Sequence, residues 1–187
     1  MRPDIVAIGA PAGGVQGVRD LVERLPENLS AAVLVVLHRS PYPESYLPET
    51  LRRVARLRVV VPIEGVLLDT GACFVGPPDK LLTVVSGFRT HLRADGYYRG
   101  YTIDALFTSL AQCAGRRVIG VTLTGLLKDG RLGLKAIKEA GGTVVLEEPK
   151  ETEIPEIHAG AFDIEIDFTG TVAGIANFIC LRTGGMS

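Results

Sequence analysis

The chain has 187 residues, of which 47% are hydrophobic, and a formal net charge of −1. This length suits one domain with a sizeable core, and the near-neutral charge gives no general electrostatic basis for binding nucleic acid. The longest apolar stretch, residues 31–37, is far shorter than the roughly 20 residues of a membrane-spanning helix. We therefore expect a single domain over residues 1–187 that neither binds nucleic acid nor inserts into a membrane.

Cysteine and histidine are sparse. Cys73, Cys113 and Cys180 are widely spaced and form no C-x-x-C pair, which argues against a disulfide framework or a zinc site. His91 and His158 have no companions at metal-ligand spacing and are expected at the surface. The N-terminus leads into a strand pattern without the apolar segment of a signal peptide. We expect a cytoplasmic protein whose cysteines pack in the interior.

Short apolar segments alternate with amphipathic segments along the chain, a pattern typical of a parallel sheet covered by helices. Several of the apolar segments are continuous runs, as expected where both faces of a sheet are buried. In chain order, the sequence predicts a strand over 5–9, a helix over 15–25, a strand over 32–37, a helix over 44–55, a strand over 58–62, a helix over 103–114, a strand over 118–123, a helix that follows Gly130 and ends at 140, a strand over 143–146, a short helix over 156–161, an extended segment over 163–168 and a helix over 172–181.

The pattern changes between residues 64 and 92. Its apolar segments are broken by Gly71, by the G-P-P-D sequence at 76–79 and by Gly87, which indicates a hairpin or small antiparallel element attached to the sheet. The polar, glycine-containing residues 93–99 indicate a loop. The predicted fold is therefore α/β: a doubly wound, mostly parallel sheet with helices on both faces and a small antiparallel hairpin.

Three features fall at the predicted ends of strands: the small-residue loop 9–14, His38, and the segment 124–130 with Asp129. In a doubly wound sheet, ligands bind beyond the carboxyl ends of the strands. A histidine, an aspartate and a strand–turn–helix junction are the parts of a serine-hydrolase triad. The turn would place its central residue beside a helix N-terminus, whose free N–H groups suit an oxyanion.

The central residue of that turn is Pro11, where a hydrolase needs serine or cysteine. Proline has neither a nucleophile nor a backbone N–H, but its fixed φ suits the first turn of a helix. The residue therefore removes chemistry while leaving the architecture intact.

The motifs together resemble the catalytic domain of the CheB-type protein-glutamate methylesterases. Residues 6–14 read VAIGAPAGG and resemble the family's VAIGASxGG, and His38 is similar to its catalytic histidine. Residues 74–79, 103–110 and 120–130 resemble the segments vyvAPpd, vDvLFxSla and GVvLTGMGxDGa. The motifs occur in family order over nearly the whole chain.

This resemblance implies hydrolysis of glutamyl methyl esters on chemoreceptors, with release of methanol, deamidation of some glutamines, and no metal or organic cofactor. It implies His38 as general base, Asp129 as its orienting partner and Pro11 at the nucleophile position. The partner would be the cytoplasmic region of a chemoreceptor or another signalling protein. The implied oxyanion and substrate region comprises Ala12, Gly13, Gly14, Gly125 and Leu126.

Departures from the family pattern gather at the site. Besides Pro11, Arg39-Ser40 replaces a Met-Pro-like pair, Leu127 replaces a glycine, and Arg131 replaces an alanine. We therefore expect impaired catalysis, as in a pseudoenzyme. Full-length family members also carry an N-terminal receiver domain, which we do not expect in this chain.

Other readings of the same residues stay open. Dinucleotide binding is disfavoured because the loop lacks GxGxxG and His38 stands where a ribose-binding acid would be expected. Ser40, Ser109 and Thr124 are candidates for a relocated nucleophile, although Ser109 is more simply a helix-face hydroxyl. Asp129 could merely cap the helix that follows it. The chain could also be a hydrolase in which His38 and Asp129 activate water, or a non-catalytic signalling module.

Overall fold

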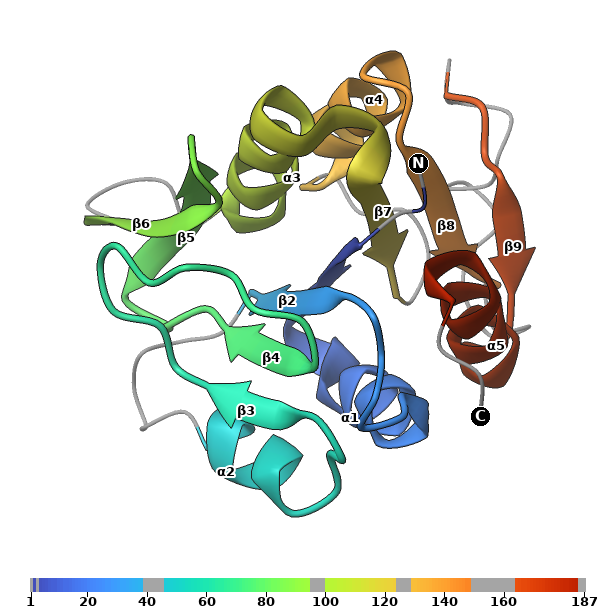
Figure 1. Ribbon diagram of the computed structural model, residues 1–187, viewed down its shortest axis with the longest axis horizontal. Helices are drawn as coiled ribbons and strands as arrows, with labels where there is room; N and C mark the ends of the chain where they lie inside the picture. The colour runs from blue at the N-terminus through green and yellow to red at the C-terminus, as the bar shows by residue number, and fades with distance from the viewer. Residues whose placement is uncertain are drawn as a thin grey trace.

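A seven-stranded parallel sheet forms the centre of the protein, with strand order β3-β4-β2-β1-β7-β8-β9 (Figure 1). The computed structural model describes residues 2, 4–38, 46–94, 100–123, 129–148 and 164–184. The strands of the sheet are β1 (Ile5–Ala10), β2 (Ala32–Leu37), β3 (Arg58–Val60), β4 (Ala72–Val75), β7 (Val118–Thr122), β8 (Thr143–Glu147) and β9 (Phe168–Gly170).

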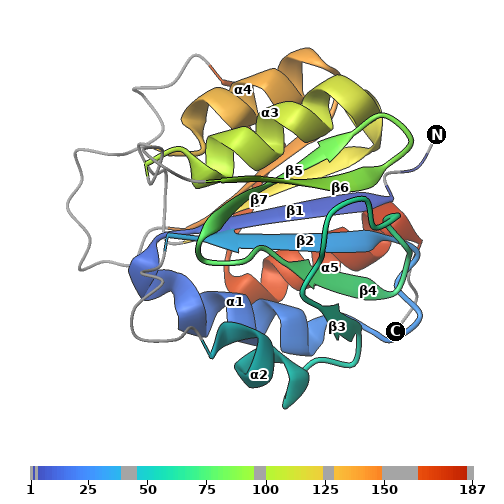
Figure 2. The same ribbon diagram turned by 90° about the vertical axis from the view of Figure 1, so that its left-hand side faces the viewer.

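Helices cover both faces of this sheet (Figure 2). One face carries α1 (Val15–Arg24), α2 (Leu47–Arg52) and α5 (Val172–Thr183). The other carries α3 (Thr102–Ala114), α4 (Arg131–Glu139) and an antiparallel hairpin of β5 (Lys80–Val85) and β6 (Arg89–Ala94). Two single 3₁₀ turns, Ala12–Gly14 and Gly115–Arg117, precede α1 and β7. No helix within the described ranges is long and apolar enough to cross a membrane.

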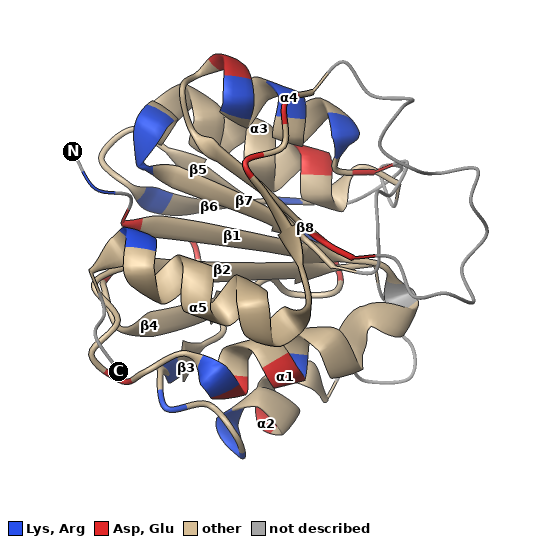
Figure 3. Ribbon diagram, turned by 90° about the vertical axis from the view of Figure 1, so that its right-hand side faces the viewer, with Lys and Arg blue, Asp and Glu red and all other residues tan. Residues whose placement is uncertain are grey.

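The sheet is central because its middle strands are apolar on both sides. Every residue of β1 and β2 is buried. Along β1, Val6 and Ile8 pack into the core under α1 and α5, whereas Ile5 and Ala7 pack into the core under α3. This is the burial expected of a parallel strand covered on both faces. Charged residues gather instead on the helices and at the ends of strands (Figure 3).

The order of the strands reverses beside β1. The chain passes from β1 through α1 to β2 on one side, and later returns through α3 to β7 on the other side. Such a reversal opens a crevice at the carboxyl ends of the strands, because the connecting helices diverge to opposite faces. The carboxyl ends of β1, β2 and β7 therefore form the expected position of a ligand site.

The predicted α/β architecture is confirmed, with local corrections. Residues 72–75 belong to the main sheet as β4, paired in parallel with β2 and β3, and not to the antiparallel element. The strand predicted over 58–62 ends at Val60, and the extended segment predicted over 163–168 becomes strand β9 only at Phe168. Arg93 and Ala94 belong to β6 and not to a loop. The short helix predicted over 156–161 lies outside the described residues.

Candidate active site

Backbone hydrogen bonds bring the ends of three neighbouring strands together around Pro11. The N–H of His38, just past β2, donates to the carbonyl of Ala10 over 3.2 Å, and the N–H of Leu123, just past β7, donates to the carbonyl of Gly9 over 3.0 Å. Of the two residues before Pro11, Ala10 is thus bonded to the β2 side and Gly9 to the β7 side. Pro11 emerges at the reversal point between β2 and β7, beside His38.

Pro11 joins β1 to α1 through a tight turn. Its φ and ψ of −69° and 174° are extended, and its carbonyl accepts the N–H of Gly14 over 2.9 Å. A Cβ on Gly14 would lie 2.7 Å from the Cβ of Ala10 and 3.1 Å from the Cδ of Pro11. Glycine is therefore needed at this position by close approach. The turn delivers the chain into α1, whose N-terminus lies next to Pro11.

His38 and Asp129 are in direct contact although they are 91 residues apart. The Nε2 of His38 contacts the Oδ2 of Asp129, and the two side chains are 28% and 3% exposed. Because Nε2 faces the carboxylate, Nδ1 is the ring nitrogen left to exchange a proton with another group. This arrangement provides a histidine oriented by a buried aspartate at an accessible edge of the sheet.

Asp129 is itself fixed by the start of α3. Its Oδ2 accepts the N–H of Ile103 over 2.9 Å, and its Oδ1 accepts the N–H of Asp104 over 2.8 Å. Donors from two backbone amides and an imidazole converge on one carboxylate, a setting that suits a negatively charged acceptor. The carboxylate therefore caps α3, and not the helix α4 that follows it in sequence, as the simplest alternative reading of Asp129 supposed. Gly130 begins α4 with a φ of +104° and no side-chain cap.

Comparison with known proteins identifies the family to which the chain belongs. A family model described as CheB methylesterase matches residues 6–179. The chain belongs to the CheB methylesterase family. It is 34% identical over 143 residues to the protein-glutamate methylesterase/protein-glutamine glutaminase 3 of Paramagnetospirillum magneticum, an alignment that covers 75% of this chain and 40% of that protein.

Further relatives agree. The protein-glutamate methylesterase/protein-glutamine glutaminase 2 of Methanosarcina mazei is 34% identical over 154 residues, which cover 78% of this chain and 42% of that protein. The chain thus spans about two fifths of the length of these CheB relatives. The crystal structure of the Thermotoga maritima CheB methylesterase catalytic domain has the same fold, with a TM-score of 0.79, 24% identity, and coverage of 96% of this chain and 98% of that one.

The CheB fold places some of the candidate site residues together. His38 and Asp129 meet beside Pro11, and Gly13 and Gly14 lie in the turn that follows it, as does the backbone of Ala12. Two other members of the implied oxyanion and substrate region, Gly125 and Leu126, lie outside the described residues.

Of the three hydroxyls considered as relocated nucleophiles, Ser109 is the one that lies within the described residues. Ser40 and Thr124 lie outside the described residues. Ser109 sits on α3, where its Oγ donates to the carbonyl of Leu106 over 2.7 Å and accepts the N–H of Val84 over 3.0 Å. Its hydroxyl ties the hairpin to α3, which agrees with the simpler reading of a helix-face hydroxyl.

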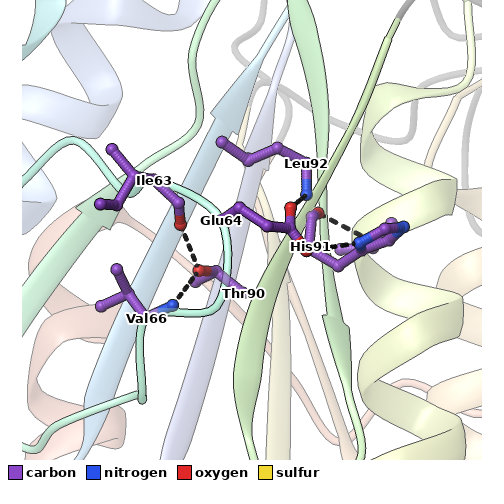
Figure 4. A network of polar contacts seen from close by, with 7 residues as sticks. Ile63, Glu64, Val66, Thr90, His91 and Leu92 are labelled. Atoms are coloured by element: carbon purple, nitrogen blue, oxygen red, sulfur yellow. Dashed lines mark hydrogen bonds and ion pairs between the residues drawn. The ribbon is translucent and has the colours of Figure 1, made fainter.

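His91 takes part in a separate network on the hairpin (Figure 4). Its Nδ1 contacts the Oε1 of Glu64 at 2.8 Å, and the Oε2 of Glu64 accepts the N–H of Leu92 over 2.7 Å. Two hydrogen bonds lower the pKa of Glu64: the larger effect comes from the backbone N–H of Leu92, and the next from the side chain of His91. The His91 side chain is 43% exposed, in keeping with its predicted surface position, and His158 lies outside the described residues.

The cysteines are only partly as predicted. Cys73 is fully buried in β4, and burial raises the pKa of its thiol to about 12. Cys113 on α3 and Cys180 on α5 pack against the core but are only half-buried, so the expectation of interior packing is wrong in degree for these two. Within the described ranges, no group of three or more His, Cys, Asp or Glu side chains could hold a metal ion.

Sequence reasoning missed the buried side chain of Asp104, in the first turn of α3. Asp104 was noted as part of a family-like segment but given no role, yet it is 6% exposed and bonds across to α4. Its signal in the sequence is an acidic residue in the first turn of an otherwise uncharged helix. Thr122 and Glu147, buried at the carboxyl ends of β7 and β8, were also not singled out.

Proposed function

We propose that this chain is a cytoplasmic CheB-type domain that binds glutamyl methyl ester segments of chemoreceptors, or of another signalling protein, and hydrolyses them only at a severely reduced rate. The observation that carries this proposal is Pro11 at the end of β1, next to the contact between His38 and Asp129. The two side chains proposed as general base and orienting acid are in contact, and the residue beside them has no nucleophile.

The proposed chemistry follows from what a serine would do at this place. A hydroxyl at position 11 would give its proton to Nδ1 of His38, the ring nitrogen that does not face Asp129, and attack the ester carbonyl, and Asp129 would stabilise the resulting imidazolium. The turn into α1 would offer N–H groups to the oxyanion. The ring of Pro11 supplies none of the attacking atoms. Binding and the oxyanion site alone can still leave roughly 10³–10⁴-fold catalysis over water, so slow turnover is compatible with the proposal.

A serine should fit at position 11 without changing the backbone. A φ of −69° and an extended ψ are ordinary for serine, and the residue precedes a helical turn, where serine is a favoured N-cap. Because proline has no N–H, the exchange breaks no hydrogen bond donated by this residue. Pro11→Ser is therefore expected to restore the missing atom and little else.

The test is methanol release from a methylated cytoplasmic fragment of a chemoreceptor. The native chain and Pro11→Ala, the matched control that also removes the proline ring, should be nearly silent. Pro11→Ser should be faster than both by roughly 10²-fold or more, because a nucleophile beside an intact base restores covalent catalysis. Adding His38→Ala to Pro11→Ser should abolish the gain.

Other outcomes identify the rival functions. Turnover of the native chain at the rate of a competent esterase, lost in His38→Ala, would indicate that His38 and Asp129 activate water instead. Silence of every variant, together with tight binding of the fragment that His38→Ala leaves unchanged, would indicate a non-catalytic signalling module.

A further inference from the structure

Two buried carboxylates tie α3 and α4 together at the site. Asp129, just before α4, accepts the N–H groups of Ile103 and Asp104 in the first turn of α3. Asp104 in turn accepts the N–H of Gly133, in the first turn of α4, through its Oδ1 over 2.6 Å. Asp129, which precedes α4, thus caps the N-terminus of α3, and Asp104 of α3 caps the N-terminus of α4. The helix dipole favours a carboxylate at each of these positions.

The packing around this exchange leaves little room for adjustment. A Cβ on Gly133 would lie 2.4 Å from the Cβ of Phe107, and a Cβ on Gly130 would lie 2.9 Å from the Cγ2 of Ile103. The two helices therefore approach as closely as glycine allows on both sides of the capping groups. A close-packed contact transmits strain, so we expect the loss of one hydrogen bond to disturb the backbone that supplies the next one.

Burying the carboxyl group of Asp104 is unfavourable unless its hydrogen bonds compensate for the lost contact with water. Its side chain is 6% exposed, and its Oδ2 has no hydrogen-bond partner among the described residues. Burial, followed by the nearby charge of Asp129, raises the pKa of Asp104, while the bond from Gly133 opposes that rise. A buried polar atom without a partner weakens the fold, so the useful oxygen of Asp104 is the one bonded to Gly133.

We propose that Asp104 is a positioning residue for Asp129. By bonding to Gly133 it locks the first turn of α3 against α4, and this holds the N–H groups of Ile103 and Asp104 where they fix the Asp129 carboxylate against His38. This inference rests on the proposed role of Asp129 as the partner of the general base. In this proposal Asp104 acts through Asp129 and is not itself a catalytic residue.

The test is the imidazole N–H resonance of His38 in the full chain labelled with ¹⁵N-histidine. The sequence has three histidines, so His38→Ala assigns the signal directly. The native chain should show a strongly deshielded N–H proton that reports the bond to Asp129. Asp104→Ala should lose this signal, and Asp104→Asn, which keeps an oxygen for Gly133, should retain it.

A matched control separates positioning from general loss of stability. Asp167 also accepts a backbone N–H, that of Val144 over 2.8 Å, but at the amino end of β8, away from His38. Asp167→Ala should keep the His38 signal. If Asp104→Ala does not fold, Asp104→Ser replaces it, because its shorter side chain leaves Gly133 uncapped. In the Pro11→Ser background, Asp104→Ala should lower kcat on the order of 10²-fold with KM nearly unchanged, as expected for a misplaced catalytic group.

The outcomes are distinguishable. An unchanged His38 signal in folded Asp104→Ala or Asp104→Ser would overturn the positioning role and leave the proposed function untouched. Loss of the signal in Asp167→Ala as well would also overturn it, because the effect would then be general. Absence of the signal in the native chain would count against the contact between His38 and Asp129, and so against the proposed function itself.

Discussion

Pro11 differs from serine by the loss of a hydroxyl and of a backbone N–H, and neither loss disturbs the surrounding fold. The neighbouring residues Gly9 and Ala10 make the strand hydrogen bonds, and the Pro11 carbonyl closes the turn with Gly14. The scaffold around position 11 therefore does not depend on the chemistry that proline removes. The partner groups are likewise complete, because the Asp129 carboxylate contacts both His38 and the first turn of α3.

Among single residues, Asp104 should make the free energy of unfolding depend on pH in a defined direction. Its folded-state pKa is raised, chiefly by burial, so between the unfolded value of about 3.9 and the raised folded value the folded chain binds more protons than the unfolded chain. Stability contributed by this group is then lost as the pH rises through that window. Asp104→Asn resembles the protonated side chain and should not show this loss.

Urea unfolding of the native chain and of Asp104→Asn between pH 4 and pH 7 measures the difference. The free energy of unfolding of Asp104→Asn should gain on that of the native chain as the pH rises. A constant difference would show that Asp104 ionises in the fold as easily as in the unfolded chain, and a difference that changes in favour of the native chain would show that it ionises more easily in the fold.

At the scale of elements, the contact between β1 and α3 determines how close the first turn of α3 lies to the site. A Cβ on Gly9 would lie 2.4 Å from the Cγ2 of Ile103, whose side chain is fully buried and whose N–H donates to Asp129. Glycine in β1 therefore allows α3 to start directly above the strand. The same close approach brings the capping N–H groups within reach of the carboxylate.

Gly9→Ala should destabilise the fold by about 1–3 kcal/mol, the usual range for overpacking a filled core. Gly17→Ala is the matched control, since Gly17 lies in the first turn of α1 and a Cβ there would meet nothing closer than 3.5 Å among the described residues. It should stabilise the protein by up to about 1 kcal/mol, because alanine favours the helix over glycine. Thermal unfolding of both variants tests the pair, and equal effects would contradict the tight contact.

The sequence predicted some elements of the fold correctly and others not, and their local patterns explain the difference. Strands β1 and β2 are continuous apolar runs with clear ends, so their positions and that of His38 were predictable. Residues 72–75 form an equally short apolar run between turns, and periodicity cannot tell a buried parallel strand from a hairpin strand at this length. The link from Asp129 to Ile103 spans 26 residues and depends on how α3 docks, which no local pattern encodes.

For the molecule as a whole, Cys73 can report global opening, because every residue of β4 is buried in the sheet. Cys73 is fully buried and the pKa of its thiol is raised to about 12, so alkylation in the native state requires the sheet to open. Cys113 and Cys180 are half-buried on α3 and α5. In pulsed alkylation near pH 8 at increasing urea, Cys73 should react only with the global transition, and the other two earlier. Early modification of Cys73 would show that the β3–β4 edge opens independently.

The whole molecule is also the scale at which the site is assembled, because β1, β2, β7 and the starts of α3 and α4 all contribute to it. The family and the fold account for this convergence, and the proposal concerns only the residue at its centre. In the proposed function, the base His38 and its partner Asp129 therefore lie beside Pro11, a position without a nucleophile.

The most direct measurement of that claim is covalent labelling with a serine-directed fluorophosphonate, followed by intact mass and peptide mapping. Pro11→Ser should gain one adduct at position 11 that disappears when His38→Ala is added, and the native chain should remain unlabelled. A native chain labelled rapidly at another serine or threonine, and dependent on His38, would contradict the account by showing that the nucleophile lies elsewhere.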